Sequence, residues 1–477
     1  MSAYVPTIGI ECHIQLKTKT KLFTAVDNDA REAKPNTLVS PLCFGMPGAL
    51  PVLNHDAIDL AIKAGIALNA EVANFSKFDR KHYFYPDLPL GYQITQFDEP
   101  IVGKGSVDVP LGDTTFKVGI TRAHMEADAG KSSHPTGADH SLVDLNRAGT
   151  PLLEIVSEPD MHSAQEARAF VKELYYLIKY SGASDVDLYY GNMRFDVNVS
   201  LSKPGEPMGT RTETKNLNSF RSVERAVEYE IARQTEVLDG GDKIKQETRG
   251  WDDDKGKTFS QRDKEDAHDY RYFPDPDLPP IVIEDSRIAS VRDDMPLLPP
   301  AIREILAKSG VADDKFDTIL ENEDFVTMLL TASDEGVSGK PLQRMVNWLT
   351  GEIQKLKSES SDEVHLTFAH LSELNDMVDA GELSSTAAKE VLTDVAVHGG
   401  SAKDVAKEKN LIQVSDTGAI EGYVDQVLSE NEQAVADVKN GEMKAIGFLV
   451  GQVMKLSKGQ ANPGMVNKMI NEKIAKL

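Results

Sequence analysis

Acidic, imidazole and basic side chains stand two residues apart in several short segments of this sequence. The pairs with this spacing are Glu11 and His13, His124 and Glu126, Arg194 and Asp196, and Glu213 and Lys215. In an extended strand, residues i and i+2 point to the same face of a sheet. Carboxylates and imidazoles can bind a hard divalent ion, and arginine and lysine can neutralise phosphate oxygens. The pairs therefore indicate a site for a magnesium-bound nucleotide, provided that they gather on a common face.

The alternative is that these pairs lie on a sheet face that is only in contact with water. A solvated face would carry lysine, threonine, serine and glutamate in arbitrary mixture, whereas these segments combine opposite charges or a carboxylate with an imidazole. For His13 the corresponding alternative is a hydrogen-bonded structural histidine, and Glu11 on the same face favours a ligand. Cys12 would point to the opposite face, so a cysteine–histidine nucleophile is excluded. The alternation by itself leaves both interpretations open.

Strands must position these pairs, and the apolar residues between the polar ones predict such strands. The segments with this alternation are 4–16, 118–126 and 194–201. Helical stretches are predicted at 55–70 and 163–181. We therefore expect an α+β domain, built on an antiparallel sheet, over residues 1–293. The polar segment 240–274 is too long for an ordinary connection, and we interpret it as a functional loop or flap.

The rest of the chain shows helical patterns. A first helix is predicted to begin at Pro299 and to end at Gly310. Further short amphipathic helices predict a helical domain over 294–400. A small helical tail domain is expected over 401–477, and it includes a predicted helix at 445–458.

Composition places the chain among ordinary globular proteins. Of its 477 residues, 40% are hydrophobic and 27% are charged. There are two cysteines, Cys12 and Cys43, so a disulfide framework is not expected and a reducing compartment fits best. The N-terminus shows no basic, apolar leader, and no apolar run approaches the roughly 20 residues of a membrane-spanning helix. We expect a cytoplasmic protein that is not embedded in a membrane.

The charge is unevenly distributed along the chain. A net charge of −24 argues against a nucleic-acid partner, because phosphate binding needs positive charge. In 439–477, however, seven lysines stand against Glu442 and Glu472, a local charge of +5. This asymmetry indicates a polyanion-binding tail, and a lysine-rich helix face without a ligand is the alternative.

Ten segments together resemble one protein family, the B subunits of the bacterial-type aspartyl/glutamyl-tRNA amidotransferases. The matching segments are 10–15, 45–54, 81–87, 124–131, 146–160, 194–199, 215–221, 268–274, 447–454 and 458–463. They follow one another in family order and span nearly the whole chain, so the resemblance is highly specific.

The resemblance implies an ATP-dependent ligase with a cradle domain, a helical domain and a tail that contacts tRNA. It also implies a heterotrimer with an amidase subunit, which makes ammonia from glutamine, and a small third subunit. The implied reaction phosphorylates the side-chain carboxylate of Glu-tRNA(Gln) or Asp-tRNA(Asn), and ammonia then displaces the phosphate. Two alternatives remain: a non-catalytic tRNA-binding scaffold in the same kind of complex, and an unrelated enzyme that phosphorylates a small carboxylate.

Carried over residue by residue, the resemblance implies roles for three groups of side chains. The expected magnesium ligands are Glu11, His13, Glu126 and Glu154. Expected catalytic residues are Asp196, Arg194 and Lys215, and expected contacts to ATP or to the acyl phosphate are Lys215, Asn216 and Arg194. Expected RNA contacts in the tail are Lys444, Lys455 and Lys458. The aromatic segments 82–85 and 270–273 are expected to shape the rim of the site or to pack as turns.

The sequence departs from the family pattern at two places. Many relatives carry a four-cysteine zinc knuckle, and here the corresponding residues are Thr24, Val26, Ser40 and Cys43. Zinc is therefore not expected to bind, since only one ligand remains. Leu90 stands where relatives often have lysine, which puts a phosphate contact by this loop in doubt.

Overall fold

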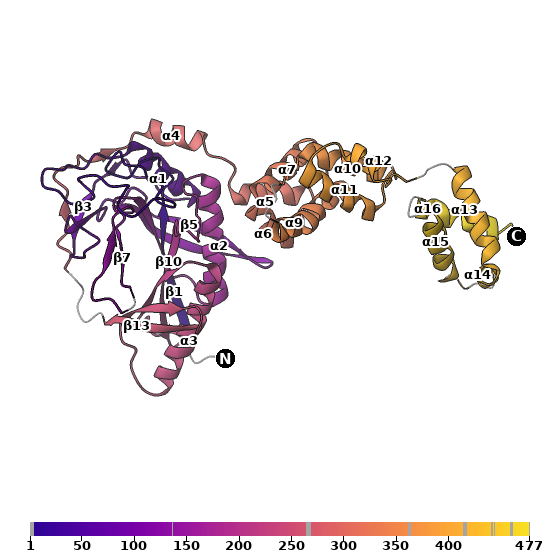
Figure 1. Cartoon of the computed structure of the whole chain (residues 1–477). Coiled ribbons are helices and arrows are strands. Elements are labelled where there is room, and N and C mark those ends of the chain that lie inside the picture. The colour runs from indigo at the N-terminus through magenta and orange to yellow at the C-terminus, as the bar shows by residue number, and fades with distance from the viewer. Residues whose placement is uncertain are drawn as a thin grey trace. The chain divides into compact units, whose positions relative to one another are not determined.

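The computed structural model describes residues 4–135, 137–263, 269–360, 364–413, 417–439, 442, 444–457 and 461–476. The chain divides into two compact units, 1–299 and 300–477, which are considered separately (Figure 1).

A mostly antiparallel sheet organises the first unit, with eleven strands in the described residues. Its order is β13 (Lys257–Asp263), β12 (Glu247–Asp252), β11 (Thr212–Leu217), β10 (Met193–Ser202), β1 (Val5–Gln15), β9 (Pro151–Ser157), β6 (Thr114–Ala127), β4 (Tyr92–Thr95), β3 (Asp79–His82) and β14 (Phe273–Pro274), while β5 (Gly105–Leu111) also pairs with β6. The pair β11–β12 is parallel. Two smaller sheets join β2 (Phe75–Ser76) to β15 (Ile281–Val282) and β7 (Lys131–Ser133) to β8 (Leu142–Asp144).

Helices cover one face of this sheet (Figure 1). They are α1 (His55–Ala67), α2 (Ala164–Ser181) and α3 (Phe220–Asp239), and a short helix α4 (Asp285–Asp293) contacts α1. On β1, Ile8, Ile10 and Ile14 are fully buried in the core that these helices share with the sheet. Because side chains alternate along a strand, Glu11 and His13 must then lie on the opposite face. The apolar half of the alternation thus fixes where the polar half points.

The strands and helices predicted for the N-terminal part are confirmed, and the flap is not. The segment 240–274 contains β12 and β13, which are strands of the main sheet. Its charge does not indicate solvation, because Arg249 is buried and lies 3.0 Å from the Glu230 carboxylate of α3. Buried ion pairs can make a strand look polar in sequence. Residues 264–268 lie outside the described part of the chain.

The second unit is helical in all its described elements, which confirms the predicted α+β class with a helical C-terminal region. Its helices are α5 (Pro299–Lys308), η1 (Asp313–Lys315), α6 (Phe316–Glu321), α7 (Glu323–Asp334), α8 (Lys340–Asn347), η2 (Trp348–Ile353), α9 (Gln354–Glu359), α10 (Phe368–Asp379), α11 (Ser385–His398), α12 (Ala402–Glu408), α13 (Thr417–Glu430), α14 (Glu432–Lys439), α15 (Lys444–Leu456) and α16 (Pro463–Ile474). Helices α13 to α16 share a small apolar core. Among the described helices, none is long and apolar enough to cross a lipid bilayer.

Candidate metal and phosphate site

A row of side chains crosses three neighbouring strands on the polar face of the sheet. In the register of the sheet, Glu154 of β9 stands opposite His13 of β1 on one side and opposite His124 of β6 on the other. Glu126 follows His124 by two residues and shares its face. Segments that are far apart in the sequence therefore bring two histidines and two glutamates to one place.

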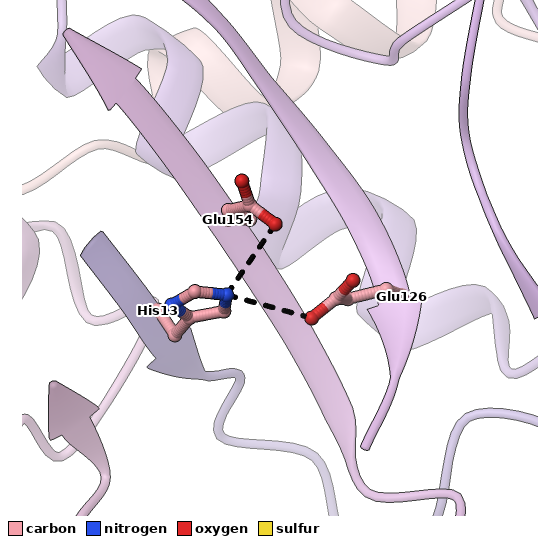
Figure 2. Close-up of side chains that lie close together, drawn as sticks. All are labelled: His13, Glu126 and Glu154. Atoms are coloured by element: carbon pink, nitrogen blue, oxygen red, sulfur yellow. Dashed lines mark ion pairs between the residues drawn. The ribbon is translucent and has the colours of Figure 1, made fainter. Parts of the chain in front are cut away.

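His13, Glu126 and Glu154 form the first cluster, and Figure 2 shows their side chains converging from three strands. The Nε2 atom of His13 lies 3.3 Å from a Glu154 oxygen and 3.7 Å from a Glu126 oxygen. One candidate ligand atom from each residue lies within 4.8 Å of the other two. Two carboxylates and an imidazole at this separation fit the coordination shell of a divalent cation.

In the first cluster, two carboxylates lie next to the single imidazole of His13, so their negative charge is only partly balanced. Burial and the neighbouring Glu154 raise the pKa of Glu126 to about 7. Although burial opposes its charge, the Glu154 and Glu126 carboxylates raise the pKa of His13 to about 9. Burial also disfavours charge on Glu154, yet the hydrogen bond from His13 holds its pKa below the usual range. The protonated His13 therefore stands where a metal ion could neutralise the same carboxylates.

His124 behaves differently from His13 although both contact Glu154. Its Nε2 atom lies 3.4 Å from a Glu154 oxygen. Burial, together with the charges of Arg122, His13 and Lys81, lowers the pKa of His124 to about 4. His124 is thus neutral at physiological pH and can orient Glu154.

A second cluster consists of Glu11 of β1, Asp196 of β10 and Glu213 of β11. It extends from β1 in the direction away from β9. Glu11 pairs in register with Asp196 of β10, and Asn198 of β10 pairs with Glu213 of β11. Burial and the charge of Glu154 raise the pKa of Glu11, which shows that the two clusters are within electrostatic reach. Asn198 donates a hydrogen bond of 3.1 Å to the Glu11 carboxylate.

The ammonium group of Lys215 partly compensates the negative charge of the second cluster. Its Nζ atom lies 2.8 Å from an Asp196 oxygen and 3.0 Å from a Glu213 oxygen. Burial favours neutral lysine, but these carboxylates raise the pKa of Lys215 well above its ordinary value. The next residue, Asn216, adopts φ +60° and donates its backbone N–H to Asp196 at 2.8 Å. Asp196 therefore holds both Lys215 and the local turn of β11 in place.

The expected site residues gather on this face, but they do not form the single set that the sequence predicts. Glu126, Glu154 and His13 lie together, whereas Glu11 belongs to the second cluster with Asp196. Arg194 stands opposite His13 in register. Glu213 is a member of the second cluster that sequence reasoning did not predict as a ligand, although its spacing from Lys215 is one of the informative pairs. The signal that could have identified it is the pairing of its strand with β10, which the sequence does not show.

In the second unit, the expected RNA contacts are only partly described. Lys444 and Lys455 are exposed at the two ends of α15, and Lys458 lies outside the described residues.

A buried lysine occupies the region where many relatives are expected to carry zinc ligands. Lys21 is fully buried, and its Nζ atom donates to the carbonyl oxygens of Leu38 at 2.7 Å and Ala148 at 2.8 Å. The same atom lies 3.6 Å from the sulfur of Cys43. Leu90, at the other departure from the family pattern, packs against the main core. A lysine cation thus connects these loops directly.

Comparisons with known proteins identify the family of this chain. Residues 6–289 match the family described as the GatB/GatE catalytic domain, and residues 334–474 match the GatB domain. The first match defines the class: a catalytic domain of the GatB/GatE type, built on the sheet that carries both clusters.

Curated relatives narrow this class further. The chain is 45% identical to the B subunit of the aspartyl/glutamyl-tRNA(Asn/Gln) amidotransferase of Listeria monocytogenes, over 98% of each chain. Its identity is 44% to that of Trichlorobacter lovleyi, over 99% of each chain. It is 43% identical to that of Caldicellulosiruptor saccharolyticus, over 99% of this chain and 100% of the relative. The chain belongs to this family of B subunits, the catalytic subunits of glutamine-dependent, ATP-hydrolysing ligases.

Proposed function

We propose that the polar sheet face activates the side-chain carboxylate of glutamate on tRNA(Gln), of aspartate on tRNA(Asn), or of both. The observation that carries the proposal is that the two clusters lie close to each other. His13, Glu126 and Glu154 offer metal ligands within 4.8 Å of one another. Lys215 of β11 places a cation in the second cluster. A carboxylate is a poor electrophile until it is phosphorylated, and phosphoryl transfer requires a metal and cationic groups around the phosphate.

The first cluster supplies ligands for Mg²⁺. His13, Glu126 and Glu154 would hold the ion, which when bound neutralises phosphate oxygens of ATP. His13 must release the proton that it shares with Glu154 before it can serve as a ligand. His124 remains neutral and fixes the orientation of Glu154.

The second cluster positions cations and a backbone turn at the reacting groups. Lys215 and Arg194 would face the transferred phosphoryl group, and Asn216 the acyl phosphate. Asp196, which contacts both Lys215 and Asn216, acts as their positioning residue. In the reaction, an oxygen of the substrate carboxylate attacks the γ-phosphorus and ADP leaves. Ammonia then attacks the carbonyl carbon, phosphate leaves, and an amide is formed after loss of a proton.

Partner subunits would supply the ammonia for the reaction. The sequence shows no serine- and glycine-rich amidase segment, so ammonia would come from an amidase subunit in a heterotrimer with a small third subunit. The exposed Lys444 and Lys455 of α15, together with Lys458, would bind the tRNA backbone. We place this complex in the cytoplasm.

We also propose that zinc has no role in this chain. Thr24 and Ser40 are poor zinc ligands, and the Val26 side chain has no donor atom. Ser40 instead lies 3.4 Å from the Cys43 sulfur. The Lys21 ammonium group beside Cys43 would repel a cation. Elemental analysis of the purified protein should find no stoichiometric zinc, and one equivalent of tightly bound zinc would refute this part of the proposal.

A conversion assay tests the main proposal. The assembled enzyme is incubated with ATP, magnesium and either Glu-tRNA(Gln) or Asp-tRNA(Asn), with glutamine or ammonium as the nitrogen source. Ammonium should support amidation without the amidase activity, because activation takes place on this chain. In Glu126→Gln, ATP-dependent phosphorylation should fall strongly. A normal rate of phosphorylation in that variant would remove the metal assignment and favour a scaffold role.

A further inference from the structure

One arginine on the polar face of the sheet has no role in the chemistry above. Arg122 lies on β6, two residues before His124, and the fully buried Ala123 between them places both side chains on the face that carries the clusters. In the register of the sheet, Arg122 stands opposite Val156 of β9, and Val156 stands opposite Glu11 of β1. Arg122 therefore begins a row of side chains directly next to the row of His124.

Within the residues that the structure describes, the guanidinium group of Arg122 has no ion-pair partner. Its Nε atom is buried, and in the same part of the chain nothing accepts a hydrogen bond from it. Other cations of this face do have acidic partners, since Lys215 contacts Asp196 and Arg194 lies 3.8 Å from Asp128. A buried donor without an acceptor destabilises a fold, so it is retained where a ligand supplies the acceptor.

The lack of a partner does not come from a lack of acids nearby. Glu154 is the diagonal neighbour of Arg122 across the pair β6–β9, and long side chains can reach across such a diagonal. The Glu154 carboxylate is instead held by His13 at 3.3 Å and by His124 at 3.4 Å. The guanidinium group of Arg122 therefore stays available to an anion from outside the chain.

Aliphatic and aromatic side chains border the same place. Val156 is half-buried on the polar face, directly opposite Arg122. Tyr272 stacks on Phe97 with a centroid distance of 4.1 Å and an interplanar angle of 7°. Burial raises the pKa of the Tyr272 hydroxyl group to about 12, and the charges of Glu126 and Arg122 act on it in opposite directions. Tyr272 is thus within electrostatic reach of both Arg122 and the first cluster.

The spacing along β6 suits a reaction between a group at Arg122 and a group at the first cluster. Arg122 and His124 are two residues apart, which is a rise of about 6.6 Å along a strand. This interval leaves room for a phosphoryl group between a metal ion in the first cluster and an anion on Arg122. A short aliphatic chain that ends in an oxyanion would fit beside Val156.

We propose that Arg122 binds the side-chain carboxylate of the aminoacyl-tRNA and orients it for attack on the γ-phosphorus of ATP. This inference rests on the proposed function, since it names the group that holds the substrate of that reaction. One carboxylate oxygen stays bonded to Arg122, while the other forms the bond to phosphorus and ADP leaves. The parallel N–H donors of a guanidinium group match a carboxylate, and Val156 would contact the methylene groups of the substrate. Phosphate oxygens of ATP already have Lys215 and the metal as partners.

Kinetics of the assembled enzyme test this assignment. Arg122→Met should lower kcat/KM for aminoacyl-tRNA by about 100-fold, because the carboxylate is no longer positioned, and should leave the KM for ATP unchanged. Arg122→Lys keeps the charge but not the planar pair of donors, so it should recover only part of this loss. Lys117→Met is the matched control, because Lys117 is an exposed cation on the same strand that pairs with Asp108.

Two kinetic or stability results would overturn the proposal. An increase in the KM for ATP in Arg122→Met would assign the guanidinium group to a phosphate instead. A marked loss of thermal stability in the same variant would assign it a structural role. We expect neither, since Arg122 has no acidic partner to lose in the described part of the chain.

A binding measurement separates this proposal from the proposed function. Affinities of the assembled enzyme for Glu-tRNA(Gln) and Gln-tRNA(Gln), which differ only in the carboxylate, are compared without ATP. The unmodified enzyme should prefer Glu-tRNA(Gln) by about 10- to 100-fold, the range for hydrogen bonds to a charged group. Arg122→Met should abolish this preference, and Lys117→Met should keep it. A preference that survives in Arg122→Met would overturn the proposal, whereas a failure of phosphorylation alone would affect only the proposed function.

Discussion

The two acidic clusters on the sheet differ in the cation that lies among their carboxylates. In the first, His13 lies between Glu126 and Glu154, and its charge depends on a proton. In the second, Lys215 lies between Asp196 and Glu213, and its charge is permanent at physiological pH. An imidazole can lose its proton and become a metal ligand, whereas an ammonium group cannot. The first cluster is therefore prepared to exchange a proton for a metal ion, whereas the second already contains a permanent cation.

The largest effect should follow from Glu154→Gln, because Glu154 contacts both histidines and would be a metal ligand. We expect kcat/KM for ATP-dependent amidation to fall by about 100- to 1,000-fold. Glu158→Gln is the control, since Glu158 ends the same segment but bonds to Thr121 at 2.8 Å. Similar losses in the two variants would mean that the effect is structural.

Lys215→Met tests whether a fixed cation distinguishes the second cluster. We expect kcat/KM to fall by about 100-fold, since a cation at the phosphoryl group is lost. The carboxylates of Glu11, Asp196 and Glu213 would then be uncompensated, so a second equivalent of Mn²⁺ should bind in a paramagnetic titration. Lys203→Met, an exposed lysine beyond β10, is the control. An unchanged Mn²⁺ stoichiometry would contradict the idea that Lys215 keeps a metal ion out of the second cluster.

The pH dependence of metal binding should show the proton exchange directly. Metal-free Glu126 and His13 have pKa values of about 7 and about 9, and both must be deprotonated in the complex. Affinity for Mn²⁺ should therefore rise with pH, by about tenfold per unit between pH 7 and 9 and more steeply below pH 7. Calorimetry in buffers of different ionisation enthalpy measures the released protons. An affinity independent of pH would show that these groups do not bind the ion.

The smallest effect is expected for Asn198→Ala. Asn198 donates one hydrogen bond to Glu11 and thereby restrains the second cluster. Its loss should lower kcat/KM by about three- to tenfold, the range for one hydrogen bond. Thermal unfolding of the variant should stay close to that of the unmodified protein. A loss as large as that of Glu154→Gln would assign Glu11 to the metal site itself.

Alternation in the sequence is enough to predict the faces of the strands. Ile8, Ile10 and Ile14 have to be buried together, so Glu11 and His13 have to share the other face. The fold class follows from the same argument, extended to the helical pattern after Pro299. Which strands are neighbours does not follow, because β1 pairs with β9 and β10, which come much later in the sequence.

The same lack of strand order explains what sequence reasoning misses at the site. Without the pairing of β10 and β11, nothing places Glu213 beside Glu11, and the four expected ligands cannot be divided into two clusters. Burial of charge is also invisible in the sequence, so the polar residues of β12 and β13 suggest a flap although Arg249 pairs with Glu230. The chemical roles of the clustered residues stay predictions until the variants are measured.

The central position of β1 affects how the protein is made. This strand is synthesised before β9 and β10, which complete its hydrogen-bonding edges. At a synthesis rate of about 5–20 residues per second, the ribosome needs on the order of ten seconds to produce those partners. During that time an isoleucine-rich segment with two open edges is exposed to other nascent chains. Yield in the cell should therefore depend on chaperones that protect this segment as it emerges, even though the finished sheet is well packed.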